Sequence, residues 1–189
     1  GARSRVADFW GTGVVADGPG YKAVDMFEAV HRGDIRVIWI MGTNPAVSLP
    51  DSARVREALA RCPTVIVSDC VAHTDTTDLA DILLPAAGWG EKDGTVTNSE
   101  RRISRQRCFL PLPAEVKPDW WIMSSVAGKL GFGEAFNYKR PADIFREHAA
   151  LSAHENNGER LFNLAGLANL SDAGYEALTP VQWPVLKGA

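Results

Sequence analysis

The chain has 189 residues, of which 46% are hydrophobic, and a formal net charge of −3 at pH 7. This length and composition predict one large folded domain, or one domain with an appendage, around a full apolar core. The acidic balance argues against non-specific nucleic-acid binding, which needs a basic excess. No apolar run approaches the roughly 18 residues that indicate a membrane span.

The cysteines Cys62, Cys70 and Cys108 are odd in number and form no C-x-x-C pair, which is typical of a reducing, cytoplasmic setting. They therefore predict no all-cysteine zinc or iron–sulfur site within this chain. The histidines show no ligand spacing, so we expect no metal site. We find no signal peptide. Because the chain begins Gly1-Ala2 without a methionine, we expect a piece of a longer protein.

Helices and strands are expected to alternate in the first half of the chain. Apolar residues at i, i+3, i+4 and i+7 predict a helix over residues 21–32, ended by Gly33. The same spacing recurs after Ser48 or Asp51, either of which could cap a second helix. A short helix is expected over residues 74–80. Apolar runs predict three strands, over residues 35–41, 64–67 and 82–84.

This order, with its short connections, predicts an α/β fold: a three-layer Rossmann-like domain with a mostly parallel central sheet. Further along, Asp93-Gly94 is a turn signal. Residues 119–130 have helical spacing, with Asp119 as the expected N-cap and Gly131 as the expected end.

Periodicity weakens after Gly133, although residues 141–150 could form a helix. We therefore predict a lead-in segment over residues 1–20, the α/β domain over residues 21–135, and an irregular extension over residues 136–189. The extension is expected to pack on domains outside this chain. In the isolated chain, residues 152–189 are expected to be poorly ordered or packed on a neighbouring copy.

Polar residues follow two of the predicted strands, at the edge where parallel sheets hold ligands. Thr43 and Asn44 follow the first strand, and Ser68 and Asp69 end the second. In dinucleotide-binding folds, an acidic residue at the end of the second strand accepts hydrogen bonds from ribose hydroxyls. The single glycine, Gly42, does not make the G-x-G-x-x-G pattern of NAD sites. Alternatives without a ligand remain open. Asn44 could belong to an ordinary turn, and Ser68-Asp69 could be a helix cap or a solvated loop.

Basic residues concentrate in "GWGEKDGTVTNSERRISRQR", residues 88–107. The segment could be a nucleic-acid patch, a phosphate clamp or a solvated face, and its acidic neighbours disfavour the first. Lys92 could place an ammonium against a phosphate or a ring carbonyl, or lie on the surface. Asp119 could match the two adjacent donors of guanine, N1–H and the 2-amino group.

Three segments in this order resemble the molybdopterin oxidoreductase superfamily: "WIMGTNPAVSLPD", "DTTDLADILLPAAGWGEKDGTVTNSERRISRQR" and "KPDWW". Within it, the chain is most similar to the catalytic subunits of bacterial assimilatory nitrate reductases. Later segments, "EHAALSAHENNGERLFNLAGL" and "YEALTPVQWPV", look like the same family.

The resemblance implies a molybdenum bis(molybdopterin guanine dinucleotide) cofactor (Mo-bis-MGD), with one arm on each of two related α/β domains, of which this is the second. It implies that Asn44 contacts the cofactor, with Gly42 and Thr43 as backbone neighbours. Ser68 and Asp69 match the family's nucleotide-proximal pair. Lys92 matches the lysine of its "EK" motif, and Asp119 the aspartate expected at guanine.

The family's N-terminal cysteine motif for a [4Fe–4S] cluster and its ligand segment for molybdenum are absent from this chain. The resemblance therefore implies an inactive, cofactor-binding fragment, with no catalytic residue, of an enzyme that reduces nitrate to nitrite. The parent would use its remaining domains and an electron-donor protein or subunit, and bind neither nucleic acid nor membrane. Alternatives are the equivalent domain of a cytoplasmic formate dehydrogenase, or an α/β interaction module without a nucleotide.

Overall fold

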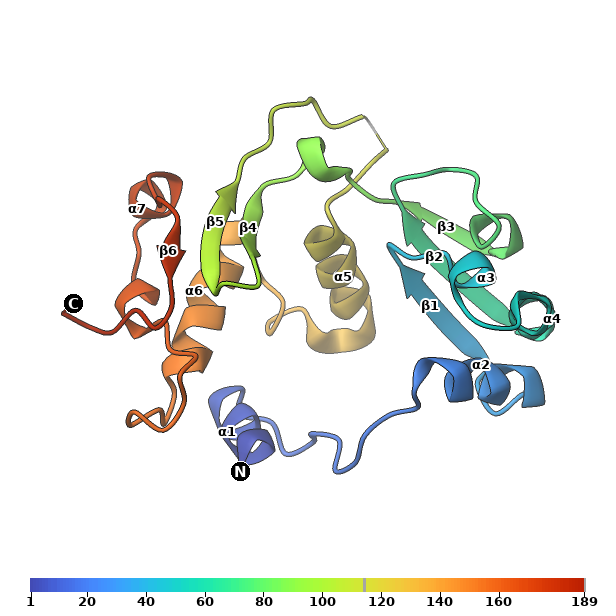
Figure 1. The fold of residues 1–189 in the computed structure, drawn as a ribbon, viewed down its shortest axis with the longest axis horizontal. Coiled ribbons are helices and arrows are strands. Elements are labelled where there is room, and N and C mark those ends of the chain that lie inside the picture. Colours follow the sequence, from blue (N-terminus) through green and yellow to red (C-terminus); the bar gives the residue numbers. More distant parts are fainter. Residues whose placement is uncertain (114, 189) are drawn as a thin grey trace. The chain divides into compact units, whose positions relative to one another are not determined.

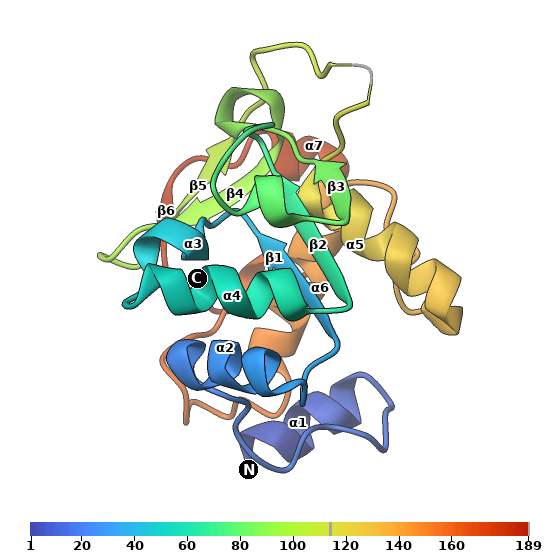
Figure 2. The same cartoon turned by 90° about the vertical axis from the view of Figure 1, so that its right-hand side faces the viewer.

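A computed structural model describes residues 1–113 and 115–188 (Figures 1 and 2). The chain forms two compact units. The sheet unit comprises Pro19–Glu91 and Leu110–Lys129, and the hairpin unit comprises Gly1–Gly18, Lys92–Phe109 and Leu130–Ala189. Each unit therefore combines segments that are far apart in the sequence. The domain boundaries after residues 20 and 135 stay predictions.

The sheet unit is built on three parallel strands, β1 (Val37–Met41), β2 (Thr64–Asp69) and β3 (Ile82–Pro85) (Figure 1). Their spatial order is β1-β2-β3, so β2 lies in the middle. All three strands fall on the predicted apolar runs. This confirms the predicted α/β class and parallel sheet.

Helices α2 (Ala23–Arg32) and α4 (Ser52–Arg61) pack against each other and against one face of β1 and β2 (Figure 2). The predicted end of α2 at Gly33 is confirmed, and of the two candidate caps of α4, Ser48 and Asp51, the structure has Asp51. Gly33 ends α2 at φ 84°, and Asp51 caps α4 by accepting a hydrogen bond from the Arg54 amide at 3.2 Å. The buried core between these elements consists of Phe27, Val30, Ile38, Ile40, Val55, Ala58, Leu59, Cys62, Val65 and Val67.

Short elements complete the sheet unit: α3 (Pro45–Ser48) and the 3-10 turns η1 (Thr77–Leu79) and η2 (Trp89–Glu91). The short helix expected over residues 74–80 is only the turn η1. The side chains of Thr74 and Thr77 bond each other's backbone amides there, and such local bonds compete with a longer helix.

Helix α5 (Asp119–Ala127) starts where it was predicted but ends earlier. A π-helical turn, η3 (Gly128–Phe132), follows it, with Gly131 at φ 92°. The N-cap is Pro118, and Asp119 is the first helical residue. The prediction that Asp119 is the N-cap was therefore wrong by one position. Proline is common at the start of a helix because it has no backbone N–H that would need a hydrogen-bond acceptor.

The hairpin unit contains an antiparallel sheet of β4 (Gly94–Thr97), β5 (Arg102–Gln106) and β6 (Val181–Gln182). The turn predicted at Asp93-Gly94 was wrong, because Gly94 pairs with Gln106 as the first residue of β4. The chain reverses instead after Asn98, whose Oδ1 accepts hydrogen bonds from the backbone amides of Glu100 and Arg102. Side-chain oxygens of asparagine favour such turns.

The hairpin unit also contains α1 (Ala2–Phe9), α6 (Pro141–Ala153), η4 (Ala165–Leu167) and α7 (Asp172–Glu176). Helix α6 confirms the helix predicted over residues 141–150. The weakly periodic tail has a core of its own, because Leu164 and Tyr175 are fully buried with Phe145 of α6. Packing of this segment on further domains stays a prediction. Among the described residues, no helix is long and apolar enough to cross a membrane.

The core of the sheet unit should tolerate truncation poorly. Leu59 of α4 is 1% exposed between both helices and the sheet. We expect Leu59→Ala to lower the free energy of unfolding by about 2–5 kcal/mol, because it removes buried methyl groups and leaves a cavity. Urea unfolding followed by circular dichroism measures the loss. Val47→Ala, at a side chain that is 57% exposed, is the control, and an equal loss there would contradict the packing.

Candidate functional site

The carboxyl ends of the three strands lie at one edge of the sheet. Met41 pairs with Ser68, and Asp69 pairs with Pro85. The loop of residues 42–44 therefore leaves the sheet beside the end of β2. The parallel register thus brings together polar residues that are separated in the sequence, at the place where open parallel sheets bind ligands.

Gly42 begins the loop after β1 in a left-handed backbone conformation, with φ 60°. A residue with a Cβ atom is strained there, so glycine suits the position. The Gly42 amide donates a hydrogen bond to the Ser68 carbonyl at 2.9 Å, which continues the β1–β2 pairing by one residue. Thr43 follows as an exposed residue and lines an apolar cavity of about 260 Å³ with residues of α2 and β1.

Asn44 is half-buried and begins helix α3, where its carbonyl accepts hydrogen bonds from the amides of Val47 and Ser48. Its side-chain Oδ1 accepts a hydrogen bond from the Thr76 hydroxyl at 2.6 Å. Among the described residues, no group accepts a hydrogen bond from its Nδ2 atom. Asn44 is therefore more than an ordinary turn residue, because its side chain is held by a second segment.

Ser68 is fully buried, and its side chain serves the sheet itself. Its hydroxyl accepts a hydrogen bond from the Trp39 indole Nε1 at 2.8 Å. Trp39 and Ser68 point to the face opposite the α2–α4 core, since side chains alternate along a strand. No local sequence pattern predicts this contact, because the two residues are 29 positions apart.

Asp69 is half-buried at the end of β2 and can accept further hydrogen bonds. Its Oδ1 accepts the Val71 amide at 2.9 Å, while Oδ2 receives no hydrogen bond from the described residues. Asp69 lines a cavity of about 220 Å³ at the ends of β2 and β3. Its wall also includes Cys70, Val71, Leu84, Pro85 and Val116. Small-molecule sites usually measure about 300–1,000 Å³, so this cavity suits only part of a larger ligand.

Asp119 reaches the same edge through a main-chain bridge. The Lys117 amide donates to the Pro85 carbonyl at 3.1 Å, and the Ala87 amide donates to the Lys117 carbonyl at 3.0 Å. This parallel bridge places the start of α5 next to the end of β3. Asp119 is half-buried in the first helical turn, where the helix dipole favours a carboxylate.

The basic residues of segment 88–107 lie in the hairpin unit, where Arg105 and Arg102 form ion pairs. The Arg105 side chain is 1% exposed and lies 2.7 Å from Asp93 and 3.1 Å from Glu176. Burial opposes its charge, but these carboxylates prevail and raise the pKa of Arg105 above its usual value. Arg102 pairs with Glu100 at 2.8 Å. Lys92 is half-buried at the beginning of this unit, and its role stays a prediction.

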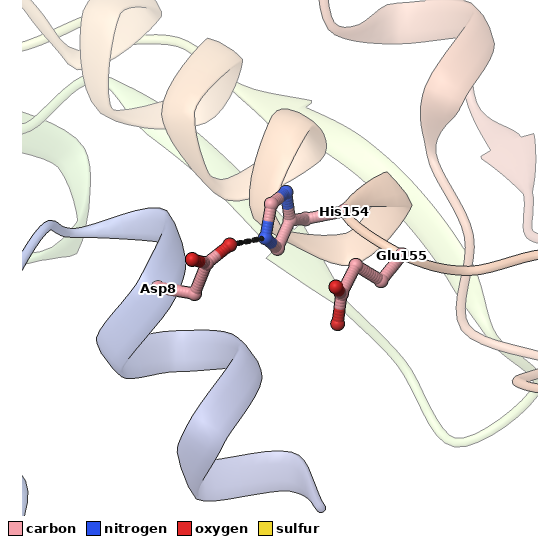
Figure 3. Close-up of side chains that lie close together, drawn as sticks. All are labelled: Asp8, His154 and Glu155. Atoms are coloured by element: carbon pink, nitrogen blue, oxygen red, sulfur yellow. Dashed lines mark hydrogen bonds and ion pairs between the residues drawn. The ribbon is translucent and has the colours of Figure 1, made fainter.

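One group of possible metal ligands occurs among the described residues, in the hairpin unit: Asp8, His154 and Glu155 (Figure 3). His154 Nε2 lies 2.8 Å from Asp8 Oδ2, and Glu155 lies 3.6 Å from Arg5. Arg5 already supplies a positive charge, and the Asp8 and Glu155 side chains are 67% and 58% exposed. The group is explained by a hydrogen bond between His154 and Asp8 and an ion pair between Arg5 and Glu155, which join α1 to the end of α6. The expectation of no metal site stays a prediction.

Residues 2–129 match the family model described as molybdopterin oxidoreductase. The nitrate reductase of Klebsiella oxytoca is 59% identical over 96% of this chain and 21% of that protein. The nitrate reductase of Shewanella frigidimarina is 53% identical over 95% of this chain and 19% of that protein. The chain thus spans about a fifth of the length of these curated relatives.

Two further matches are less similar. The F420-dependent formate dehydrogenase subunit alpha of Methanocaldococcus jannaschii is 46% identical, but over 60% of this chain and 17% of that protein. Among solved structures, acetylene hydratase from Pelobacter acetylenicus superposes with a TM-score of 0.67, covering 97% of this chain and 24% of that one. Its sequence identity of 14% supports the fold alone.

Replacing Ser68 should distinguish a role in the sheet from a role in ligand contact. We expect Ser68→Ala to destabilise the chain without any ligand by about 1–3 kcal/mol, because the Trp39 indole loses its buried acceptor. Urea unfolding monitored by tryptophan fluorescence measures this. Ser48→Ala, at an exposed serine of α3, is the control. Unchanged stability of Ser68→Ala would show that its hydroxyl is not needed by the sheet.

Proposed function

The chain belongs to the molybdopterin oxidoreductase family, and we propose that it is the part of a nitrate reductase that holds one guanine dinucleotide arm of the molybdenum cofactor. The assembled edge of the sheet carries this proposal. Asn44, Asp69 and Asp119 come from three separate segments and are brought there by strand pairing and by the Lys117 bridge.

The residues at this edge suit a guanosine nucleotide. The two oxygens of the Asp119 carboxylate match the N1–H and 2-amino donors of guanine. Asp69 keeps one oxygen for the ribose hydroxyls. Gly42 and Thr43 contribute their backbone. Lys92 belongs to the hairpin unit, and we propose separately that its ammonium serves a phosphate or a ring carbonyl of the cofactor.

Ser68 acts differently in this proposal. Ser68 is fully buried, and its hydroxyl accepts the hydrogen bond of the Trp39 indole. It therefore stabilises the end of β2, where Asp69 lies. The cavity beside Asp69, at about 220 Å³, suits a base or a ribose better than a whole dinucleotide. This chain would therefore enclose one end of the cofactor, and other domains of the parent would enclose the rest.

Family membership implies a molybdopterin cofactor, and when bound it supplies the oxygen-atom transfer that converts nitrate to nitrite. The residues of this chain bind and orient that cofactor, and we assign none of them a catalytic role, so the chain alone should be inactive. We place the Mo-bis-MGD form, the [4Fe–4S] cluster and the electron-donor protein in the parent enzyme. A cytoplasmic location is part of the proposal and rests on the cysteine pattern of the sequence.

Nitrate is favoured over formate as the substrate of the parent. The two nitrate reductases match about 96% and 95% of this chain at 59% and 53% identity. The formate dehydrogenase subunit matches 60% of it at 46% identity. The more similar and more extensive matches therefore support a nitrate reductase.

Nucleotide titration tests the guanine site. We expect the chain to bind GDP weakly and to prefer it to ADP by about tenfold, because the Asp119 carboxylate pairs with donors that adenine lacks. Calorimetry gives the affinities. Amide chemical-shift changes, which detect weaker binding, should concentrate at Asn44, Asp69 and Asp119. Asp119→Asn should abolish the preference.

Asp34→Asn is the matched control, because Asp34 precedes β1 at the opposite edge of the sheet and pairs with Arg32. It should leave the affinity for GDP unchanged. Equal affinity for GDP and ADP would refute the guanine role of Asp119. The absence of any shift change with either nucleotide would instead favour an interaction module without a nucleotide ligand.

The substrate is tested on the full-length enzyme that contains this chain. We expect it to reduce nitrate to nitrite with a chemical electron donor, and not to oxidise formate, because the similarity to nitrate reductases covers nearly the whole chain. Nitrite formation and formate-dependent dye reduction are the two assays. Formate oxidation without nitrate reduction would overturn the assignment of the substrate.

A further inference from the structure

Thr76 connects the segment before η1 to the loop after β1. Its side chain is completely buried, and its Oγ1 atom has two partners among the described residues. The Ala46 amide donates to Oγ1 at 3.1 Å, and Oγ1 donates to Asn44 Oδ1 at 2.6 Å. Ala46 is also completely buried, so solvent does not replace these bonds.

The direction of these bonds follows from the chemistry of the three groups. A backbone N–H can only donate, so the Thr76 oxygen accepts from Ala46. Its single hydrogen then needs an acceptor, and the Asn44 side chain lies 2.6 Å away. Only the carbonyl oxygen of a carboxamide can accept. The opposite orientation of the Asn44 amide would leave a buried hydroxyl hydrogen without a partner, which is costly.

We infer that Thr76 is a positioning residue that fixes Asn44 as a hydrogen-bond donor at the ligand-binding edge. With Oδ1 held by Thr76, the Nδ2 hydrogens remain for a ligand. The group they select must be an acceptor, such as a phosphate oxygen or a ring carbonyl. The identity of that ligand rests on the proposed function, whereas the orientation of Asn44 does not.

The unmodified chain tests the orientation directly by nuclear magnetic resonance. With Oδ1 toward Thr76, the Asn44 side-chain amide hydrogens should exchange rapidly with solvent and show no strong nuclear Overhauser effect to the Thr76 Hβ. A strong effect between those hydrogens and the Thr76 Hβ would overturn the inference. This measurement needs neither a variant nor a ligand.

A pair of variants tests the role of the hydroxyl. Thr76→Val keeps the shape of the side chain without the hydroxyl, and Thr76→Ser keeps the hydroxyl. We expect Thr76→Val to shift or broaden the Asn44 side-chain amide signals and to weaken GDP binding by about tenfold. Thr76→Ser should retain both properties within about twofold. Circular dichroism of each variant monitors folding.

The positioning role of Thr76 and the proposed nucleotide binding can be refuted independently. Unchanged Asn44 signals in folded Thr76→Val would overturn the positioning role, whatever happens to GDP. If Thr76→Val does not fold, the Overhauser measurement on the unmodified chain decides. If the unmodified chain shows no GDP binding at all, the proposed function loses its support, while the Asn44 signals still decide whether Thr76 positions that side chain.

Discussion

The main-chain pairing of β2 with both of its neighbours is the interaction on which the candidate site depends. Strands that run in parallel end at the same edge of a sheet. Met41 pairs with Ser68, and the next residue of β2, Asp69, pairs with Pro85. The loops that follow them are then neighbours whatever their length. The Lys117 bridge adds one more chain segment to this edge of the sheet, just after the end of β3. A site drawn from residues 42 to 119 is thus assembled by backbone hydrogen bonds.

The parts of this fold that could be predicted are those with local, periodic signals. Helices α2 and α4 each bury one face against the sheet, so their apolar residues repeat with helical spacing. Strands β1 and β2 are short runs of mostly apolar residues, and alternate side chains of each run are buried in the core under the helices. Their ends, and hence Asn44 and Asp69, follow from the same pattern. The sheet edge was therefore visible in the sequence.

Contacts between distant residues left no such signal. Thr76 lies 32 positions from Asn44, and Trp39 lies 29 positions from Ser68, so no local pattern connects either pair. The hairpin unit depends on the same kind of contact, because Arg105 and Glu176 are 71 positions apart. Its short turns and two-residue strand carry too few residues to show a period. For that reason the tail looked irregular, although its core is well packed.

The bridge at Lys117 holds the start of α5 through peptide groups alone. Its two hydrogen bonds use the amide and the carbonyl of Lys117, and its side chain lies apart from them, 5.8 Å from the ring centre of Trp121. Proline is the one residue type that could not form the first of these bonds, because it has no backbone N–H. The start of α5, and with it Asp119, is thus tied to the end of β3 by a main-chain contact that requires no particular side chain of Pro85 or Ala87.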